Sequence, residues 1–147
     1  MNSLFDAIPY LAAYQTSFLI LAVLSLATLI QNFLSAPLSF VHEEQVPGLP
    51  LKFDHSKLSF RVLRTYANSV ENFPAFGWAL LVAIVAGASP FIVNWIAAIY
   101  LAFRMLFWAV YYSGVGKVAG GPRTMVFVGG LVSNIVLAGV AIWAIVT

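Results

Sequence analysis

The stretch YLAAYQTSFLILAVLSLATLIQNFL, residues 10–34, contains no charged side chain, and its polar side chains are hydroxyls, two glutamines and one asparagine. The uncharged run extends from Asp6 to Glu43. A helix needs about 20 mainly apolar residues to cross a bilayer. This stretch therefore predicts a first transmembrane helix. We expect it to end near Ala36-Pro37, because proline disfavours helical geometry in the residue before it.

Further helical segments follow along the chain. A helical pattern runs over residues 58–87, but its apolar part, from Phe73 to Gly87, is too short to cross a bilayer alone. The membrane must therefore include part of its polar half. Pro90 marks a turn, and a glycine-rich loop precedes the last segment. The sequence thus predicts an all-α integral membrane protein, a bundle of four transmembrane helices over about 10–34, 58–87, 91–112 and 124–146.

Composition favours one membrane unit and excludes several kinds of site. Of 147 residues, 62% are hydrophobic and 8% are charged, whereas about a quarter of the residues in soluble domains are charged. Four spans with short connections use the whole length, so we expect residues 1–147 to form a single domain. The absence of cysteine excludes disulfides and thiolate metal sites. A net charge of +2 is too small to indicate nucleic acid as a partner.

The basic residues predict the orientation in the membrane. All but one lie at the loops that join spans one to two and three to four: Lys52, Lys57, Arg61, Arg64, Lys117 and Arg123. Positive residues favour the cytoplasmic side. We therefore expect both long loops in the cytoplasm and both termini outside. The first apolar segment is longer than a signal-peptide core and follows no positive residue, so we expect it to be retained as a helix.

A stripe of polar residues marks the second span. At about 100° per residue, Arg61, Arg64, Asn68, Glu71 and Asn72 fall within an arc of about 100° on one helix face. Charges that face lipid cost at least ~2.5 kcal/mol each at depth, so the stripe should face a protein interior or a polar cleft. Two guanidiniums, an amide and a carboxylate suit a zwitterionic ligand. The alternative is an ion-pair ladder that only joins helices.

The third span carries a matching face with Tyr100, Arg104, Phe107 and Tyr111. We expect Arg104 to need an acidic partner inside the membrane. Glu71 is the only acid inside a span, so an Arg104–Glu71 pair is the direct hypothesis, and capping of carbonyl groups by Arg104 is the alternative. Tyr111 could contact a ligand or belong to the interfacial belt of aromatic residues.

Arg123 lies at the start of the fourth span, on the same side of the membrane as the stripe. It could stabilise an anion, or it could anchor the helix end, which is the commoner role of a lone interfacial arginine. His42 and His55 lack metal-ligand spacing, so no metal site is expected. The small residues of the fourth span, Gly129 and Gly130 among them, are assigned to helix packing.

The run RVLRTYANSVENFP, residues 61–74, fits the pattern R-x-x-R-x-x-x-N-x-x-E-x-x-P. It resembles the second-helix signature of the MAPEG family, the membrane-associated proteins in eicosanoid and glutathione metabolism. The chain length, the four-span plan and the spacing of Arg104 and Tyr111 are also similar to that family. The segment from Tyr112 to Thr124 is similar to its bacterial branch in particular.

The resemblance implies a homotrimer that binds glutathione between neighbouring subunits near the cytoplasmic face. By their place in the motif, Arg64, Asn68, Glu71 and Tyr111 would contact glutathione, the cosubstrate, and Arg123 would be the catalytic residue that stabilises its thiolate. The implied activity is that of a glutathione transferase, with peroxidase activity as an option, in a bacterial inner membrane. The second partner would be a lipophilic small molecule or lipid that reaches the sulfur from the bilayer.

Three departures from the family pattern bear on the substrate. Asn72 replaces the aromatic residue that often follows the signature glutamate, and Phe107 occupies a position that is often polar or aromatic with a donor. The first span also lacks the arginine near its cytoplasmic end that assists leukotriene-C synthase. Eicosanoid synthesis is therefore not expected. A noncatalytic lipid-binding or scaffold protein of the same fold is the main alternative. A channel or transporter is a weaker one, because the other spans offer few polar positions.

Overall fold

A computed structural model of the chain describes residues 4–41, 54–116 and 120–147. Within these ranges the regular structure is helical. Two short helices, α1 (Leu4–Ala7) and α2 (Pro9–Ala12), precede four long ones, α3 (Gln15–Val41), α4 (Leu58–Val85), α5 (Pro90–Ser113) and α6 (Pro122–Val146). The all-α fold predicted from the sequence is confirmed. His42, Lys52 and Lys117 lie outside the described residues.

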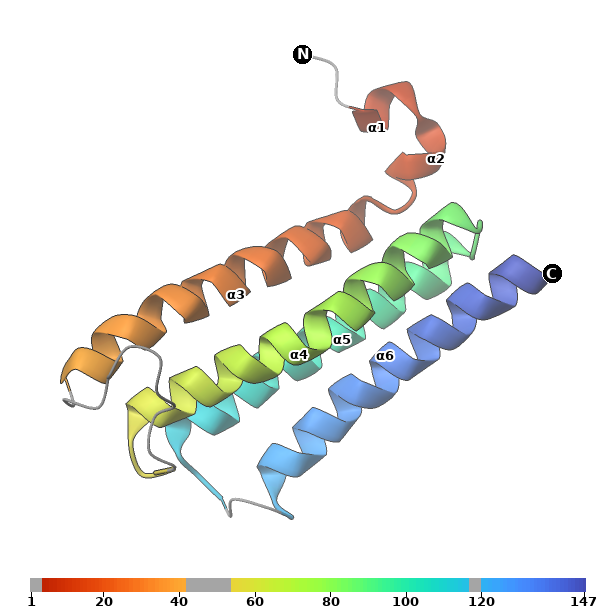
Figure 1. The fold of residues 1–147 in the computed structure, drawn as a ribbon. Coiled ribbons are helices and arrows are strands. Elements are labelled where there is room, and N and C mark those ends of the chain that lie inside the picture. Colours follow the sequence, from red (N-terminus) through yellow and green to blue (C-terminus); the bar gives the residue numbers. More distant parts are fainter. Residues whose placement is uncertain (1–3, 42–53, 117–119) are drawn as a thin grey trace.

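The long helices form one bundle in which the chain direction alternates (Figure 1). α4 and α5 lie at its centre, and α3 and α6 lie on opposite sides of this pair (Figure 1). The turn between α4 and α5, the beginning of α3 and the end of α6 share one end of the bundle. The beginnings of α4 and α6 share the other end. Residues that begin α4 and α6 are therefore brought close together although they are far apart in sequence.

Proline and glycine set the ends of the central helices. Pro90 and Pro122 occupy the first turns of α5 and α6, where a missing N–H costs nothing. Gly114 follows α5 with φ of 72°, a left-handed conformation that glycine adopts without strain, and its N–H donates to the carbonyl of Tyr111. These signals account for the bounds of α5 and α6. All of α4, α5 and α6 begin and end within about two residues of the predicted spans.

The first span differs from its prediction at both ends. The chain from Tyr10 does not enter α3 directly, because α2 ends at Ala12 and α3 begins at Gln15. The expected end near Ala36-Pro37 is wrong, since Pro37 lies inside α3, which continues to Val41. Proline removes one helical hydrogen bond and needs room for its ring. Pro37 is exposed, so the ring has that room outside the bundle.

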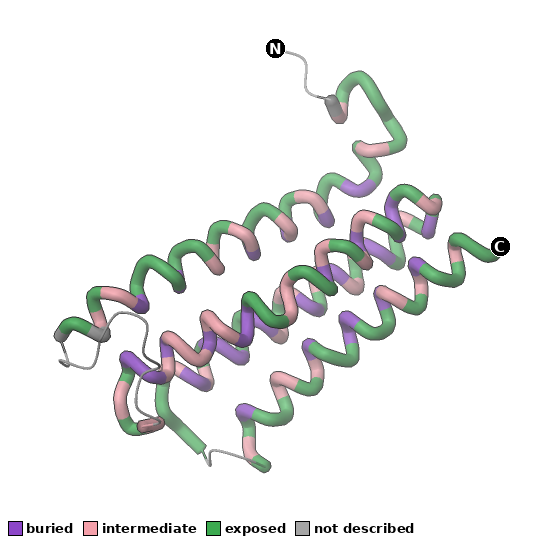
Figure 2. The backbone as a smooth tube through the Cα atoms, viewed as in Figure 1, coloured by how far each residue is buried: buried purple, intermediate pink, exposed green. Residues whose placement is uncertain are grey.

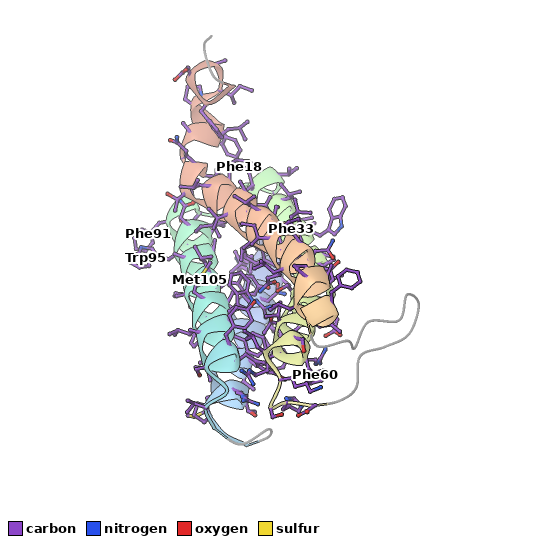
Figure 3. The ribbon with its side chains drawn as sticks, turned by 90° about the vertical axis from the view of Figure 1, so that its left-hand side faces the viewer. Phe18, Phe33, Phe60, Phe91, Trp95 and Met105 are labelled. Atoms are coloured by element: carbon purple, nitrogen blue, oxygen red, sulfur yellow. The ribbon has the colours of Figure 1, made fainter. Side chains whose placement is uncertain are left out.

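The surface of the bundle is largely apolar. Its core contains a parallel stack of Phe76 on Tyr100, with ring centroids 4.1 Å apart, and buried residues face inward along all four long helices (Figure 2). Phe33, Phe91 and Trp95 instead point away from the bundle (Figure 3). Among the described residues, three helical segments are long and apolar enough to cross a membrane, namely Gln15–Leu38, Pro90–Ser113 and Pro122–Val146. Such a surface fits lipid rather than water.

The close contact of α5 and α6 depends on small residues. A methyl group added at Gly129 would overlap the ring of Phe103, and one added at Gly130 would lie 3.6 Å from the Cβ of Phe103. The packing role assigned to Gly129 and Gly130 from the sequence is therefore confirmed. This contact fixes α6 against α5, and so fixes where the beginning of α6 lies.

Candidate functional site

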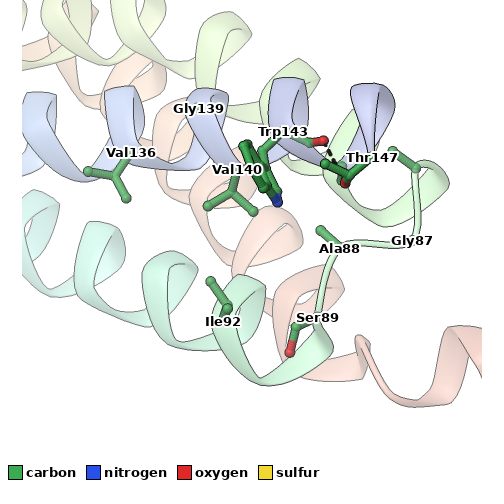
Figure 4. Close-up of a pocket in the computed structure, with 11 residues that line it drawn as sticks. Gly87, Ala88, Ser89, Ile92, Val136, Gly139, Val140, Trp143 and Thr147 are labelled. Atoms are coloured by element: carbon green, nitrogen blue, oxygen red, sulfur yellow. Dashed lines mark hydrogen bonds between the residues drawn. The ribbon is translucent and has the colours of Figure 1, made fainter.

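Two cavities differ in chemistry. The larger, about 650 Å³, opens between the turn after α4 and the end of α6 (Figure 4), and it is lined by Trp143, Ser89, Thr147 and small or apolar residues, without a charged side chain. The smaller, about 170 Å³, lies between α4, α5 and α6 at the opposite end of the bundle. Its lining residues are Arg64, Asn68, Phe107, Tyr111, Arg123, Thr124 and Phe127. We call it the arginine cavity, and its groups are the ones that can do chemistry.

The arginine cavity brings together most of the residues that the sequence singled out. Arg64 and Asn68 come from α4, Tyr111 comes from the last turn of α5, and Arg123 comes from the first turn of α6. Glu71 does not line the cavity. It lies one turn farther along α4 and forms an ion pair with Arg64, with Nη1 and Oε1 3.2 Å apart.

Arg123 has a buried guanidinium with unused donors. The residue is 4% exposed, and its Cζ lies 4.8 Å from the centre of the Tyr111 ring. This cation–π contact holds the plane of the guanidinium against the tyrosine. Its Nε and Nη1 have no hydrogen-bond partner among the described residues. Buried polar groups are rarely left unpaired, so the arrangement favours an acceptor bound in the arginine cavity.

The expected Arg104–Glu71 pair is wrong. Arg104 donates from Nη1 to Oδ1 of Asn68, 2.7 Å away, and from Nη2 to Oγ of Ser69, 3.1 Å away. The stripe on α4 is wide enough that its two edges have different surroundings. Asn68 lies on the buried edge and meets Arg104, whereas Glu71 lies on the outer edge with Arg64, where the two side chains are 57% and 42% exposed.

Arg61 turns away from the arginine cavity. Its Nη1 donates to the backbone carbonyls of His55 and Ser56, at 2.9 and 2.6 Å. Its guanidinium also lies against Gly114, where an added Cβ would be 3.3 Å from Cζ. Arg61 therefore ties the beginning of α4 to the end of α5, and the contacts of this stripe residue are structural.

His55 lies beside the site although the sequence suggested no role for it. Its ring packs edge-on against Phe60, at 4.8 Å between centroids, and lies 6.1 Å from the ring of Tyr111. Burial lowers the pKa of His55, and the charges of Arg123 and Arg64 lower it further. Within the described part of the chain, no cluster of three histidine or acidic side chains could hold a metal ion.

Some cavity residues were missed by the sequence reasoning. Phe127 follows Arg123 by four positions, so helical periodicity would have placed it on the same face once α6 was known to begin at Pro122. Thr124, one position on, carried no such signal. Phe107 belonged to the predicted face of the third span, but it was noted only as a departure from a pattern. The signal for His55 was weaker, since it depends on how the loop before α4 folds.

The comparisons with known proteins agree with this architecture. The model of the MAPEG family matches residues 10–143, which is nearly the whole chain. No curated protein gives a significant match. The matched range contains all four long helices up to the last turn of α6, and with them every residue of the arginine cavity. The chain is therefore an integral membrane protein of the MAPEG family, whose fold is a four-helix membrane bundle and whose members include glutathione transferases and eicosanoid enzymes.

Proposed function

We propose that the chain is a membrane-bound glutathione transferase that activates the thiol of glutathione for attack on a lipophilic electrophile. The observation that carries this proposal is the state of Arg123, a buried guanidinium in the lining of a cavity with two nitrogens free to donate. Donors buried without partners are costly. A thiolate in the arginine cavity supplies the missing acceptor.

Arg123 acts on the protonation state of the sulfur. An ordinary thiol of this kind has a pKa of about 8.5, and a nearby guanidinium favours the thiolate, which is the nucleophile. The thiol releases its proton to water, the sulfur forms a bond to the electrophilic carbon, and the leaving group departs with its bonding electrons. Phe107 and Phe127 give the cavity an apolar wall that suits a lipophilic second substrate.

The tripeptide backbone of glutathione is assigned to the stripe. In this proposal Arg64, which pairs with Glu71 in the structure, would pair with a carboxylate of the ligand, Asn68 would hydrogen-bond a polar group of the peptide, and Glu71 would accept from the ammonium group. The Tyr111 hydroxyl offers a further contact beside the sulfur. The arginine cavity, about 170 Å³, is smaller than the roughly 300–1,000 Å³ of most ligand pockets. A bound glutathione must therefore extend beyond it, toward the exposed pair of Arg64 and Glu71.

The part of glutathione outside the cavity needs a cover, and a second copy of the chain can supply it. α4 exposes Glu71, Ala75, Trp78, Val82 and Val85, which recur at alternating spacings of four and three residues, the pattern of a helix-packing seam. We assign this seam to the contact between copies in a homotrimer. The basic residues near the cavity favour the cytoplasmic side for this end of the bundle, and we assign the chain to the inner membrane of a bacterium in that orientation.

The test is conjugation of glutathione to an aryl chloride activated by nitro groups, with purified full-length chain in detergent. Arg123→Ala should lower turnover about 100-fold, because the thiol is then mostly protonated, while the affinity for glutathione changes less. Arg123→Lys keeps a positive charge and should recover part of the turnover. The ultraviolet absorbance of the bound thiolate should fall in the same order, from the wild type to Lys to Ala.

Folding must be separated from chemistry in this test. Thermal unfolding of each variant shows whether the bundle is intact, and Thr124→Ala is a matched control, since it alters the cavity beside Arg123 without removing a charge. Turnover that is unchanged in Arg123→Ala removes Arg123 from the mechanism. A wild-type chain that binds fatty acyl ligands but neither conjugates glutathione nor gains stability from it would instead be a noncatalytic member of the fold.

A further inference from the structure

Arg104 lies just outside the lining of the arginine cavity and contacts residues that form it. It is 4% exposed and is not among the residues that line the cavity. Its Nη1 donates to Oδ1 of Asn68 at 2.7 Å, and its guanidinium lies over the ring of Phe107, 5.1 Å from the centroid. Both Asn68 and Phe107 do line the cavity. Arg104 therefore contacts two of the cavity walls without reaching the ligand space.

The chemistry of arginine fixes which way the Asn68 amide points. Arginine carries only hydrogen-bond donors, whereas a side-chain amide has a carbonyl oxygen and an NH2 group. The short contact with Arg104 therefore requires the oxygen of Asn68 to face α5. The NH2 group is on the opposite branch of the amide and is the part left for a ligand. The hydrogen-bond partners of a side-chain amide decide which way its oxygen and its NH2 group point.

A network behind Arg104 holds it in this position. Its Nη2 donates to Oγ of Ser69, which donates to Oε1 of Gln31 at 2.8 Å. Nε2 of Gln31 donates in turn to the hydroxyl of Tyr112 at 2.9 Å. The network joins α3, α4 and α5 in the buried part of the bundle, where a partly satisfied network would be costly. Arg104 has little freedom to turn toward another partner.

We infer that Arg104 is a positioning residue that presents the NH2 group of Asn68 to the arginine cavity. Together with Arg64 and Arg123, this makes three residues of the lining that offer donors, two from α4 and one from α6. The group recognised at Asn68 is therefore an acceptor, a carboxylate or carbonyl oxygen, and not an ammonium group. This inference rests on the proposed function only for its ligand, glutathione, and it assigns to Asn68 one of the ligand's oxygen atoms.

Asn68→Asp tests the polarity of this contact. The substitution keeps the oxygen that faces Arg104 and replaces the NH2 group by a second oxygen. Binding of glutathione to the full-length chain, measured by calorimetry, should weaken about tenfold or more, since a charged hydrogen bond is lost and like charges meet. Asn68→Ala, which removes the donor without adding charge, should weaken binding less. If glutathione binds to Asn68→Asp as tightly as to the wild type or more tightly, position 68 accepts a hydrogen bond from the ligand, and the inference is overturned.

Two substitutions of Arg104 that differ in charge and in hydrogen-bonding groups test its positioning role. Arg104→Lys keeps a donor for Oδ1 of Asn68, whereas the amide of Arg104→Gln can present either end. Arg104→Gln should raise the KM for glutathione more than it lowers kcat, and Arg104→Lys should restore much of that KM. A merely structural role would lower the apparent kcat through loss of folded protein and leave KM unchanged. Equal KM values in all three proteins would overturn the positioning role.

A ligand-free measurement separates this inference from the proposed function. In a double-mutant cycle of Arg104→Gln and Asn68→Ala, the shifts in unfolding temperature should be non-additive, because the second change removes a contact that is already lost. Additive shifts would overturn the contact itself. If the wild-type chain binds no glutathione, the proposed function fails, and the cycle still decides whether Arg104 orients Asn68.

Discussion

His55 shows that burial and the charges of the arginine cavity act together on a neighbouring residue. It lies directly before α4, between Phe60 and Tyr111, and its Nδ1 is buried without a hydrogen-bond partner among the described residues. Burial lowers its pKa first, then the charges of Arg123 and Arg64, with a smaller contribution from Arg61. Asp54 opposes them only in part. The folded chain therefore disfavours a charged imidazole at this position.

We predict that the stability of the chain falls on acidification through the range where histidine titrates. Below a pH of about 6.5, the ordinary pKa of histidine, His55 of the unfolded chain binds a proton more readily than His55 of the folded chain. Acid therefore lowers the free energy of unfolding. Above it both states are neutral at His55, and the effect vanishes. The thermal unfolding temperature in detergent, followed from about pH 7.5 to 5.5, should decline less in His55→Gln than in the wild type.

The chain offers a matched control for this prediction. His42→Gln removes the other histidine and keeps His55 itself, so the acid-induced loss should persist. Asp54 does not confuse the result, because its hydrogen bonds to Ser56 lower its pKa below the ordinary aspartate value, outside the range studied. Parallel pH curves for the wild type and His55→Gln would show that His55 does not carry the effect.

At the residue scale, the sequence predicted the arginine cavity well where charge and helix geometry decide the answer. Arg64, Asn68, Tyr111 and Arg123 could be placed near one another because each lies near the same end of a predicted span. The partner of Arg104 could not be predicted. Whether it meets Glu71 or Asn68 depends on how α4 is rotated against α5, and a stripe about 100° wide leaves that rotation open.

At the element scale, the contact between α5 and α6 depends on one glycine. An added Cβ at Gly129 would overlap the ring of Phe103, whereas one at Gly139, in the same helix, would have nothing within 4 Å. The two positions therefore form a matched pair. Both glycines lie in the interior of α6, so helix propensity alone favours alanine at each by up to about 1 kcal/mol.

Gly129→Ala should destabilise the bundle by about 1–3 kcal/mol, because the new methyl group forces Phe103 or the helix backbone to move. Gly139→Ala should be neutral or slightly stabilising. Thermal unfolding of both variants in the same detergent measures the difference, and Phe103→Leu combined with Gly129→Ala should recover part of the loss. If the two alanine variants have the same stability, α5 and α6 are not held together by close approach at Gly129.

The elements themselves divide into two kinds. α5 and α6 have strong local signals at their ends, namely Pro90, Gly114 and Pro122, and their bounds, like those of α4, were predicted closely. α3 has no local signal that decides where the helix ends. Pro37 normally marks a helix end, but a single lost hydrogen bond is small beside the packing of a long helix on its neighbours, and exposure gives the proline ring space.

At the scale of the whole molecule, the exposed side of α4 is out of place in a monomer. Glu71 and Arg64 form a half-exposed ion pair on a helix that the family fold places in a membrane. Each charged side chain that faces lipid at depth costs at least ~2.5 kcal/mol of free energy. A second copy packed along α4 would remove the ion pair from lipid and would also cover the neighbouring Trp78 and Val85 of the seam, which are 70% and 85% exposed.

We predict that Ala75, an exposed residue near the middle of this seam, lies close to its counterpart in another copy. The chain contains no cysteine, so Ala75→Cys gives a single thiol, and mild oxidation should yield a disulfide-linked dimer within a particle of trimer mass. Two cysteines join only when their Cα atoms lie within about 7 Å, so the link reports direct contact. Leu106→Cys, exposed on α5, should remain unlinked. A monomer mass, or linkage through α5 alone, would refute the α4 seam and leave the arginine cavity without its cover.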